Sequence, residues 1–232
     1  DYMALPDLPG DLVLPEGLLS IGAHAFDGAS WLENLTVPAS VTSIGEYAFS
    51  VYSLQSIDLK CQIISIPDGM LSGTRITEFD ISDGVVSIGD SAFENCSSIV
   101  SLKLPQGIES IGDKAFASMR NLETINIPST VKTFGTDVFN GCDKLLLDNV
   151  TIEDGCIAVV KEGGVLYSGD MKTLLYYPAT NTQSEYVMPD EVENIPNDLF
   201  NYHDYVTSVV LSKNLKKIPG GTFSGSKITS IK

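Results

Sequence analysis

The sequence predicts an α/β solenoid: a right-handed coil of 22–23-residue repeats, each with short parallel strands and a short helical turn, interrupted by a small β-meander insert. Three observations predict it. The phrase Ile-Gly-x-x-Ala-Phe recurs at a nearly fixed spacing, a short alternating segment precedes each copy, and a single interval of 61 residues breaks the series. Eight copies in nearly constant register do not arise by chance, and a period of this size is typical of stacked coils.

The repeated phrase defines the coils. Four copies are complete and four are degenerate, and their first residues are separated by 23, 22, 22, 23, 23, 61 and 23 residues. The Phe at the end of each copy is expected to fill the interior of its coil. The copies are 21–26, 44–49, 66–71, 88–93, 111–116, 134–139, 195–200 and 218–223.

Each coil is expected to begin with a strand. Alternation of apolar and other residues directs the first and third side chains inward and the middle one outward, and a Pro that often follows ends the strand. A second extended piece ends at the repeat Ile. The strands are expected to stack as one parallel sheet, and the alternating segments are 12–14, 35–37, 57–59, 79–81, 102–104, 125–127 and 209–211.

A Gly or Pro after the repeat Ile predicts a corner, where Gly allows unusual backbone angles and Pro fixes one. Acidic residues directly after this corner, such as Asp68, Asp90 and Asp113, suit the N-terminus of a helix. The segment that follows is therefore predicted to be one or two helical turns. Three residues after the repeat Phe lies a packing position, which holds Cys96 and Cys142 as small apolar side chains.

The pattern Leu-x-x-Leu-x-Leu, as in 32–37 and 122–127, is the leucine-rich-repeat signature, and the repeats resemble the BspA-like leucine-rich-repeat family of bacterial surface proteins. The 61-residue interval carries 164–178, which resembles an insert common in that family. The resemblance implies a non-enzymatic, cell-surface or secreted protein of host-associated bacteria. Its implied role is adhesion through a protein ligand, such as a host extracellular-matrix protein or another cell.

The division of the chain follows from the interval. Residues 1–144 are expected to form the N-terminal coils, 145–185 a β-hairpin or meander insert, and 186–232 the C-terminal coils, all within one continuous solenoid domain. Strand-like segments 156–161, 165–168 and 174–177, separated by Gly-rich turns, predict the meander.

Charge excludes several functions. Fourteen basic and 30 acidic residues give a formal net charge of −16, which repels nucleic acid and anionic membranes. No run of apolar residues is long enough to predict a transmembrane segment. The chain opens with Asp1, Tyr2 and Met3 rather than with a basic and apolar leader, so we expect either a mature form or a trimmed piece, with neither signal nor anchor in these 232 residues.

The outward strand positions are the predicted binding surface, which we call the strand face. They form columns of small polar residues with an acidic centre, and they are expected to contact a basic or polar patch of a protein ligand. The alternative is a solvated face on a structural spacer. The residues are Asn34, Thr36, Ser56, Asp58, Glu78, Asp80, Ser101, Lys103, Thr124 and Asn126.

A second candidate is an aromatic patch around the insert, formed by Tyr167, Tyr176, Tyr177, Tyr202 and Tyr205. Tyr-rich exposed patches are favoured at interfaces, and the alternative is that these side chains form the core of the insert.

No catalytic, metal or cofactor motif is found in the sequence. Neither His24 nor His203 has a possible catalytic or metal-binding partner at a sequence spacing typical of such sites. The enzymatic alternative is a β-helix polysaccharide-active enzyme that uses Asp58, Glu78 and Asp80. The scarcity of Arg and the Ala-Phe turn weigh against it, so we expect no enzyme and no cofactor.

Overall fold

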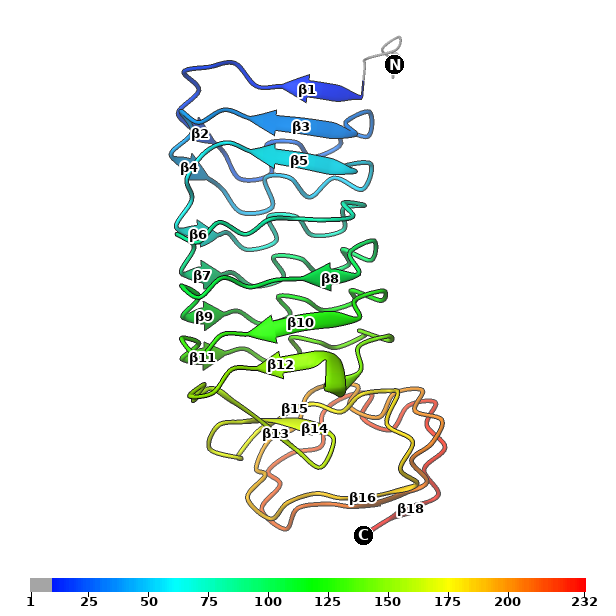
Figure 1. Ribbon diagram of the computed structural model, residues 1–232. Coiled ribbons are helices and arrows are strands. Elements are labelled where there is room, and N and C mark those ends of the chain that lie inside the picture. Colours follow the sequence, from blue (N-terminus) through cyan, green and yellow to red (C-terminus); the bar gives the residue numbers. More distant parts are fainter. Residues whose placement is uncertain (1–9) are drawn as a thin grey trace.

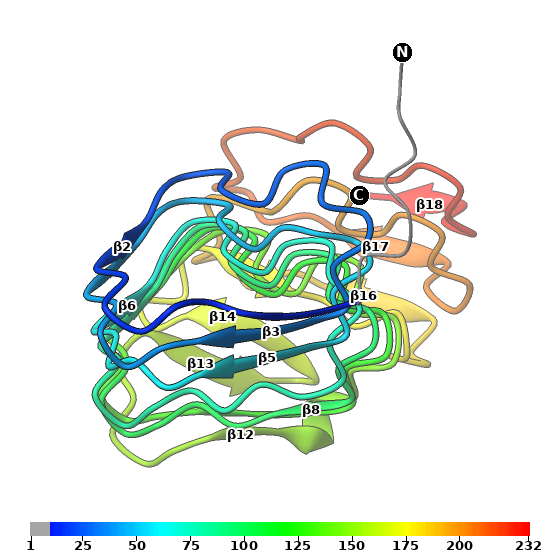
Figure 2. The same cartoon turned by 90° about the horizontal axis from the view of Figure 1, so that it is seen from above.

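The computed structural model describes residues 10–232 and shows a stack of coils (Figure 1). Residues 1–9, and with them the prediction made from the opening residues, lie outside the described part. Seen from above, successive coils superpose on one another (Figure 2), as the constant repeat length requires. The predicted solenoid of parallel strands is therefore confirmed.

The first strand of each coil pairs in parallel with its neighbours, in register: Leu35 lies opposite Leu12 on one side and Ile57 on the other. These strands form three separate sheets, so the prediction of one continuous sheet is wrong. The segment 79–81 lies in no strand, and the insert separates the third sheet from the second. The sheets are β1 (Asp11–Val13), β3 (Asn34–Val37) and β5 (Ser56–Leu59); β8 (Ser101–Leu102), β10 (Thr124–Ile127) and β12 (Val150–Ile152); and β16 (Glu185–Val187), β17 (Ser208–Val210) and β18 (Ser230–Ile231).

In the six coils of 21–139 the second extended piece is a two-residue strand that ends at the repeat Ile or its Phe equivalent, as predicted. Before Ile195 it is reduced to a single bridge at Asn194, and before Ile218 no strand forms. The two-residue strands also pair in parallel, with Ile66, Ile88 and Ile111 in one row. They are β2 (Ser20–Ile21) with β4 (Ser43–Ile44), and β6 (Ser65–Ile66), β7 (Ser87–Ile88), β9 (Ser110–Ile111) and β11 (Thr133–Phe134).

The predicted helical turns are not helices. Within residues 10–232 the one helical segment is a single 3-10 turn, η1 (Leu147–Asn149). In the turn segments, several backbone N–H groups donate to the next coil, as Phe93 N does to Ala115 O at 2.8 Å and Phe116 N to Val138 O at 3.2 Å, while others donate three residues back along the chain, as Glu94 N does to Ser91 O at 3.0 Å. A helix would need these donors within its own segment.

The acidic residues after the corner have a different role from the one predicted. The carboxylate of Asp68 accepts a hydrogen bond from Asp90 N at 2.8 Å, that of Asp90 accepts one from Asp113 N at 2.7 Å, and that of Asp113 accepts one from Thr136 N at 2.7 Å. Each carboxylate therefore bonds its coil to the next coil. The sequence pattern had placed it instead at the N-terminus of a helix, stabilised by the helix dipole.

The corner glycines are needed for space rather than for unusual backbone angles, which corrects the prediction. Positive φ angles lie two residues later, at residues such as Lys114 (55°) and Asp137 (55°), and not at Gly112 or Gly135. A Cβ on Gly112 would lie 2.6 Å from the backbone N of Asp90 in the preceding coil. The backbones of adjacent coils therefore lie too close together at this corner for a side chain.

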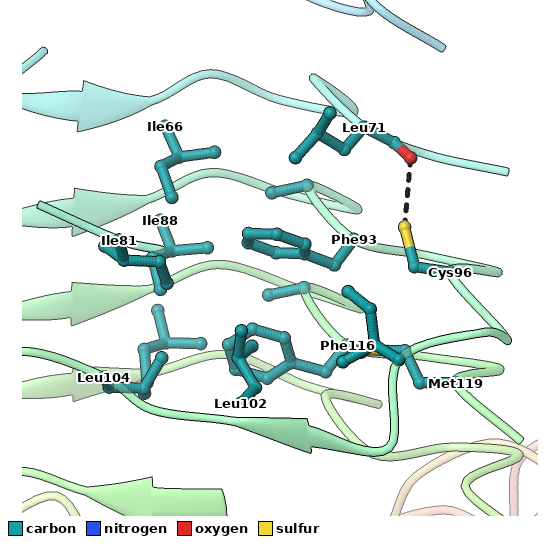
Figure 3. Close-up of a cluster of buried hydrophobic side chains, with 14 of the residues drawn as sticks. Ile66, Leu71, Ile81, Ile88, Phe93, Cys96, Leu102, Leu104, Phe116 and Met119 are labelled. Carbon is teal, nitrogen blue, oxygen red and sulfur yellow. Dashed lines mark hydrogen bonds between the residues drawn. The ribbon is translucent and has the colours of Figure 1, made fainter. Parts of the chain in front are cut away.

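The core runs along the stack as columns of equivalent side chains (Figure 3). The repeat Phe residues contact one another from coil to coil: Phe93 and Phe116 have ring centroids 5.8 Å apart, and Phe116 and Phe139 are 5.9 Å apart. Leu71 replaces the ring in the third coil. Cys96 lies beside this column, and its thiol donates to Leu71 O at 3.0 Å.

The insert is a three-stranded antiparallel sheet of β13 (Val159–Glu162), β14 (Val165–Ser168) and β15 (Leu174–Tyr176). Its two faces contribute to two different cores. On β14, Val165 and Tyr167 pack with the C-terminal coils, whereas Leu166 packs with the N-terminal coils. The sheet therefore joins two hydrophobic cores, which we call the first stack and the second stack.

The chain direction changes at the insert. In Figure 1 the first stack is seen from the side and the coils of 186–232 are seen end-on, and in Figure 2 the reverse holds. Next to β15 the insert is joined to the second stack: Thr173 forms an isolated parallel bridge with Asn194, and Leu174 N donates to Asn194 O at 3.0 Å. No helix in the described residues is long and apolar enough to cross a membrane.

Candidate functional site

The strand face is presented by the first two sheets. Parallel register places equivalent residues of adjacent coils side by side: Thr36 lies next to Asp58, and Ser101 next to Thr124. The alternation of the strands directs these side chains away from the core, whose inward neighbours Leu35 and Leu102 are buried. The predicted columns therefore exist within each sheet.

Several polar side chains of this face bond to one another. Asn34 Nδ2 donates to Asp11 Oδ1 at 2.6 Å, and Ser56 Oγ donates to Asn34 Oδ1 at 2.6 Å. Thr124 Oγ1 donates to Ser101 Oγ at 2.6 Å. These side chains link neighbouring coils, and their hydrogen-bonding groups are partly used within the protein.

Asn126 has a structural role. Its side-chain oxygen accepts a hydrogen bond from Leu104 N at 2.8 Å, and its amide nitrogen donates to Leu104 O at 2.9 Å. The side chain thus continues the hydrogen bonding where β8 has already ended. The backbone of Leu104 uses one N–H donor and the oxygen of this amide, so Asn126 has less to offer a ligand than its exposed neighbours.

The acidic centre of the strand face differs from its ends. Asp58, Glu78 and Asp80 are exposed, and within residues 10–232 their carboxylates have no hydrogen bond or ion pair. Glu78 and Asp80 lie between β5 and β8, where the sheet is interrupted. Lys103 is exposed in the next coil. The carboxylates of Asp58, Glu78 and Asp80 are free to contact a cationic partner. A substitution of these residues removes no hydrogen bond or ion pair within residues 10–232.

The predicted aromatic patch does not exist as a surface. Tyr167, Tyr176 and Tyr177 are buried, at 2%, 7% and 2% exposure, and only Tyr202 and Tyr205 are exposed. Tyr167 and Tyr186 share a hydrogen bond between their hydroxyls at 2.8 Å, and burial raises the pKa of both. The rings of Tyr167, Tyr176 and Tyr177 cover the two faces of the insert. For these three residues the alternative is therefore correct: they form the core of the insert.

The buried cysteines Cys96 and Cys142 have packing roles. Burial raises the pKa of the Cys96 thiol to about 11 and that of Cys142 to about 12, which leaves both thiols protonated and unreactive near neutral pH. Cys142 Sγ donates to Phe116 O at 3.1 Å. His24 is exposed beside Asp27. The described residues contain no group of three His, Cys, Asp or Glu side chains placed to hold a metal ion.

His203 makes stability depend on pH. It is 5% exposed and packs against Tyr177 and Phe200, and burial lowers its pKa to about 4, with Asp204 opposing the shift. The unfolded chain binds the proton more readily, so stability is complete above the ordinary pKa of 6.5 and is lost as the pH falls toward 4. A difference of about 2.5 between the two pKa values corresponds to about 3 kcal/mol.

This dependence is measured by urea unfolding of the wild type and of His203→Phe at pH 7 and at about pH 4. The wild type should lose up to about 3 kcal/mol more than the variant over this range. The same loss in both proteins would show that His203 is not the group that titrates.

A feature that the sequence did not predict is a cleft of about 500 Å³ where the two stacks meet. Its lining comes from the last two coils of the first stack, from the insert and from residues within 196–203. Asn197 Nδ2 donates to Asp137 Oδ2 across this junction at 3.2 Å. Residues 60 positions apart meet here because the insert changes the direction of the chain, for which the repeat pattern gives no signal.

Comparison with known proteins agrees with the geometry. The family model of the BspA type leucine-rich repeat region matches in six copies, over residues 19–146 and 175–232. Among curated proteins, none is significantly similar to the chain.

Among solved structures, the pneumococcal vaccine antigen PcpA superposes with a TM-score of 0.75 at 24% identity over 95% of this chain and 60% of that one. A leucine-rich repeat protein from Eubacterium ventriosum gives 0.63 at 22% identity, covering 96% of this chain and 55% of that one. A leucine-rich cell surface protein from Faecalibacterium prausnitzii gives 0.58 at 18%, covering 96% and 87%. The chain thus spans little more than half the length of the first two, and these likenesses concern the fold.

Proposed function

Since the chain belongs to the BspA-type leucine-rich-repeat family, we propose that it is a non-enzymatic, protein-binding solenoid of a bacterial surface or secreted protein. Its role is adhesion to a host extracellular-matrix protein or to another cell. The superposed proteins include one named a cell surface protein and one named a vaccine antigen, which supports an extracellular location for a chain of this fold.

The observation that carries the proposal is the set of unpaired carboxylates Asp58, Glu78 and Asp80 at the centre of the strand face. Carboxylates that bond to nothing within the described protein keep their full charge for a partner, and charge complementarity speeds association and fixes orientation. The partner is therefore a protein with a basic patch, and its attraction is reinforced by the net charge of −16.

The test is biolayer interferometry against a panel of matrix proteins, mucins and host glycans at physiological salt. It compares the wild type with a triple variant, Asp58→Lys, Glu78→Lys and Asp80→Lys. The control triple variant, Glu16→Lys, Asp83→Lys and Asp154→Lys, changes the charge equally at exposed residues outside the strand face. It separates the effect of the face from that of net charge.

The expected result is saturable binding of the wild type to one protein, a loss in affinity of at least about tenfold in the face variant, and little change in the control. Binding should also weaken as salt is raised. Equal losses of affinity in both variants would assign the effect to net charge. No binding to any member of the panel would favour a structural spacer. Turnover of a polysaccharide, abolished by Asp58→Asn or Asp80→Asn, would favour the enzymatic alternative.

A further inference from the structure

The strand face is interrupted at the first extended piece of the fourth coil, residues 77–81, which lies between β5 and β8 by repeat position. No backbone N–H or C=O group of this segment takes part in a hydrogen bond within residues 10–232. One coil earlier, Lys60 N donates to Val37 O at 3.0 Å. The equivalent donor of the fourth coil, Ser82 N, has no such acceptor in the described chain.

The rest of the fourth coil is held on both sides. β7 pairs with β6 and with β9, and in the turn Phe93 N donates to Ala115 O at 2.8 Å. Two inward side chains anchor the unpaired segment: the ring of Phe79 packs edge-on against that of Phe93 with centroids 5.5 Å apart, and Ile81 is 9% exposed. The fourth coil therefore stays in the stack while the backbone of 77–81 remains outside the ladder.

Charge accounts for the missing pairing. The offset of 22 residues that sets Thr36 opposite Asp58 in β3 and β5 would set Asp80 opposite Asp58 on its other side. Pairing would bring these two exposed carboxylates to about 5 Å from each other, and like charges directly opposite destabilise a sheet. The pair that does form, Thr36 with Asp58, contains only one charge.

No base of the described chain neutralises this repulsion. Neither Asp58 nor Asp80 has an ion pair within residues 10–232, although Lys103 follows Asp80 in the same column at an offset of 23 residues. Both carboxylates are exposed, so a positive group from outside can reach them. A cation between two anions turns their mutual repulsion into two attractions.

We infer that residues 77–81 form a strap, which the repulsion between Asp58 and Asp80 holds out of the ladder and which joins the ladder when a positive charge lies between them. Closure gives Ser82 N an acceptor at Leu59 O and joins the first two sheets into one. The inference rests on the proposed function in one respect, that the partner supplies the positive charge. The opening of the strap depends on the two carboxylates alone.

Amide hydrogen exchange of the full chain, read by mass spectrometry in peptides that cover 77–82, tests the strap. The wild type is compared with Asp58→Asn and with Asp80→Asn, each of which removes one of the two charges. Asn and Asp are both disfavoured in strands, so slower exchange in these variants reports the charge. The control double variant, Glu123→Gln and Asp154→Asn, removes two exposed carboxylates in other coils.

In the wild type, 77–82 should exchange with little protection, whereas the paired strand β10 should exchange slowly. Each Asn variant should slow exchange in 77–82 at least tenfold, and the control double variant should leave it unchanged. Each rate is divided by that of the same unfolded variant, because a substitution also changes the intrinsic rate of its neighbours.

Hexalysine is the probe for a cationic partner. At a concentration that saturates its binding, measured by the fluorescence anisotropy of a labelled copy, it should slow exchange of 77–82 in the wild type at least tenfold. It should add nothing in the double variant Asp58→Asn and Asp80→Asn, whose strap is already closed. If no natural protein partner of the strand face exists, the proposed function fails, but the results with the Asn variants stand.

Three results would overturn the inference. The first is exchange at 77–82 as slow in the wild type as in β10, which would show that the segment is already paired. The second is unchanged exchange in both Asn variants, which would show that charge does not hold the strap open. The third is saturated hexalysine binding without slower exchange, which would separate the strap from a cationic partner.

Discussion

Phe116→Ala should lower the free energy of unfolding by about 3–5 kcal/mol, because it removes a fully buried ring from the middle of the core and leaves a cavity. The ring is 0% exposed and contacts Phe93 on one side and Phe139 on the other. The coils above and below are fixed by hydrogen bonds of their own, such as Phe116 N to Val138 O, so they cannot collapse into the space. Equilibrium unfolding in urea measures the loss.

The matched control is Phe26→Ala in the first coil. Phe26 has the same position in its repeat, but it is half-buried and has one aromatic neighbour, Phe49, at 5.8 Å. Its replacement should cost clearly less than that of Phe116. A loss below about 1 kcal/mol for Phe116→Ala would contradict the account, because removal of a central ring from a closely packed column should cost more free energy than that.

Gly112→Ala should destabilise the protein by about 2 kcal/mol or more, although it adds only a methyl group. The added Cβ would lie 2.6 Å from Asp90 N and 2.7 Å from Gly89 C. Both atoms belong to the backbone of the preceding coil, which the hydrogen bond from Asp113 N to Asp90 Oδ1 fastens at 2.7 Å. A backbone held in this way cannot move aside as a flexible side chain would.

Gly22→Ala is the control, since Gly22 is the equivalent residue of the first coil and a Cβ there meets nothing within 4 Å. Its effect should stay within about 1 kcal/mol, and a small stabilisation is acceptable because alanine restricts the unfolded chain. Urea unfolding of the two variants side by side distinguishes the explanations. Equal losses would mean that the corner needs glycine for its backbone angles after all.

The repeat made much of the fold predictable. Alternation in segments such as 35–37 predicts which side chains face inward, and Leu35 and Val37 are indeed buried. The fixed spacing of the repeat Phe residues predicts that each ring fills the interior of its coil, and Phe93 and Phe116 are both fully buried with ring centroids 5.8 Å apart. Such features follow from periodicity, because every coil meets the next one in the same way.

Features that depend on how one coil bonds to the next were harder to predict. The segment after each corner has the composition of a helix N-terminus, but several of its N–H groups donate to the following coil, as Ser91 N does to Asp113 O at 2.8 Å. Local propensity carries no information about such a partner 22 residues away. The same reason explains why the sequence did not reveal that the corner glycines give space to a neighbouring backbone.

The same distinction, between features that follow from the repeat and features that depend on contacts between coils, applies to the candidate sites. The strand face could be predicted from alternation, but the occupied amide of Asn126 could not, because its partner is the backbone of Leu104 one coil earlier. The tyrosines of the insert were proposed as a possible surface, and Tyr177 is buried because the insert has a core on both faces. The cleft arises from the change of direction at the insert, where no repeat extends.

The central proposal is that a protein partner contacts the acidic centre of the strand face. Carbodiimide labelling of carboxylates, read by mass spectrometry with and without the bound partner, tests it most directly. The account predicts that Asp58, Glu78 and Asp80 become protected, while Asp83, Glu109 and Asp143, which lie elsewhere, label as before. Unchanged labelling of the first three in a saturated complex, with protection at other carboxylates, would show that the partner uses a different surface.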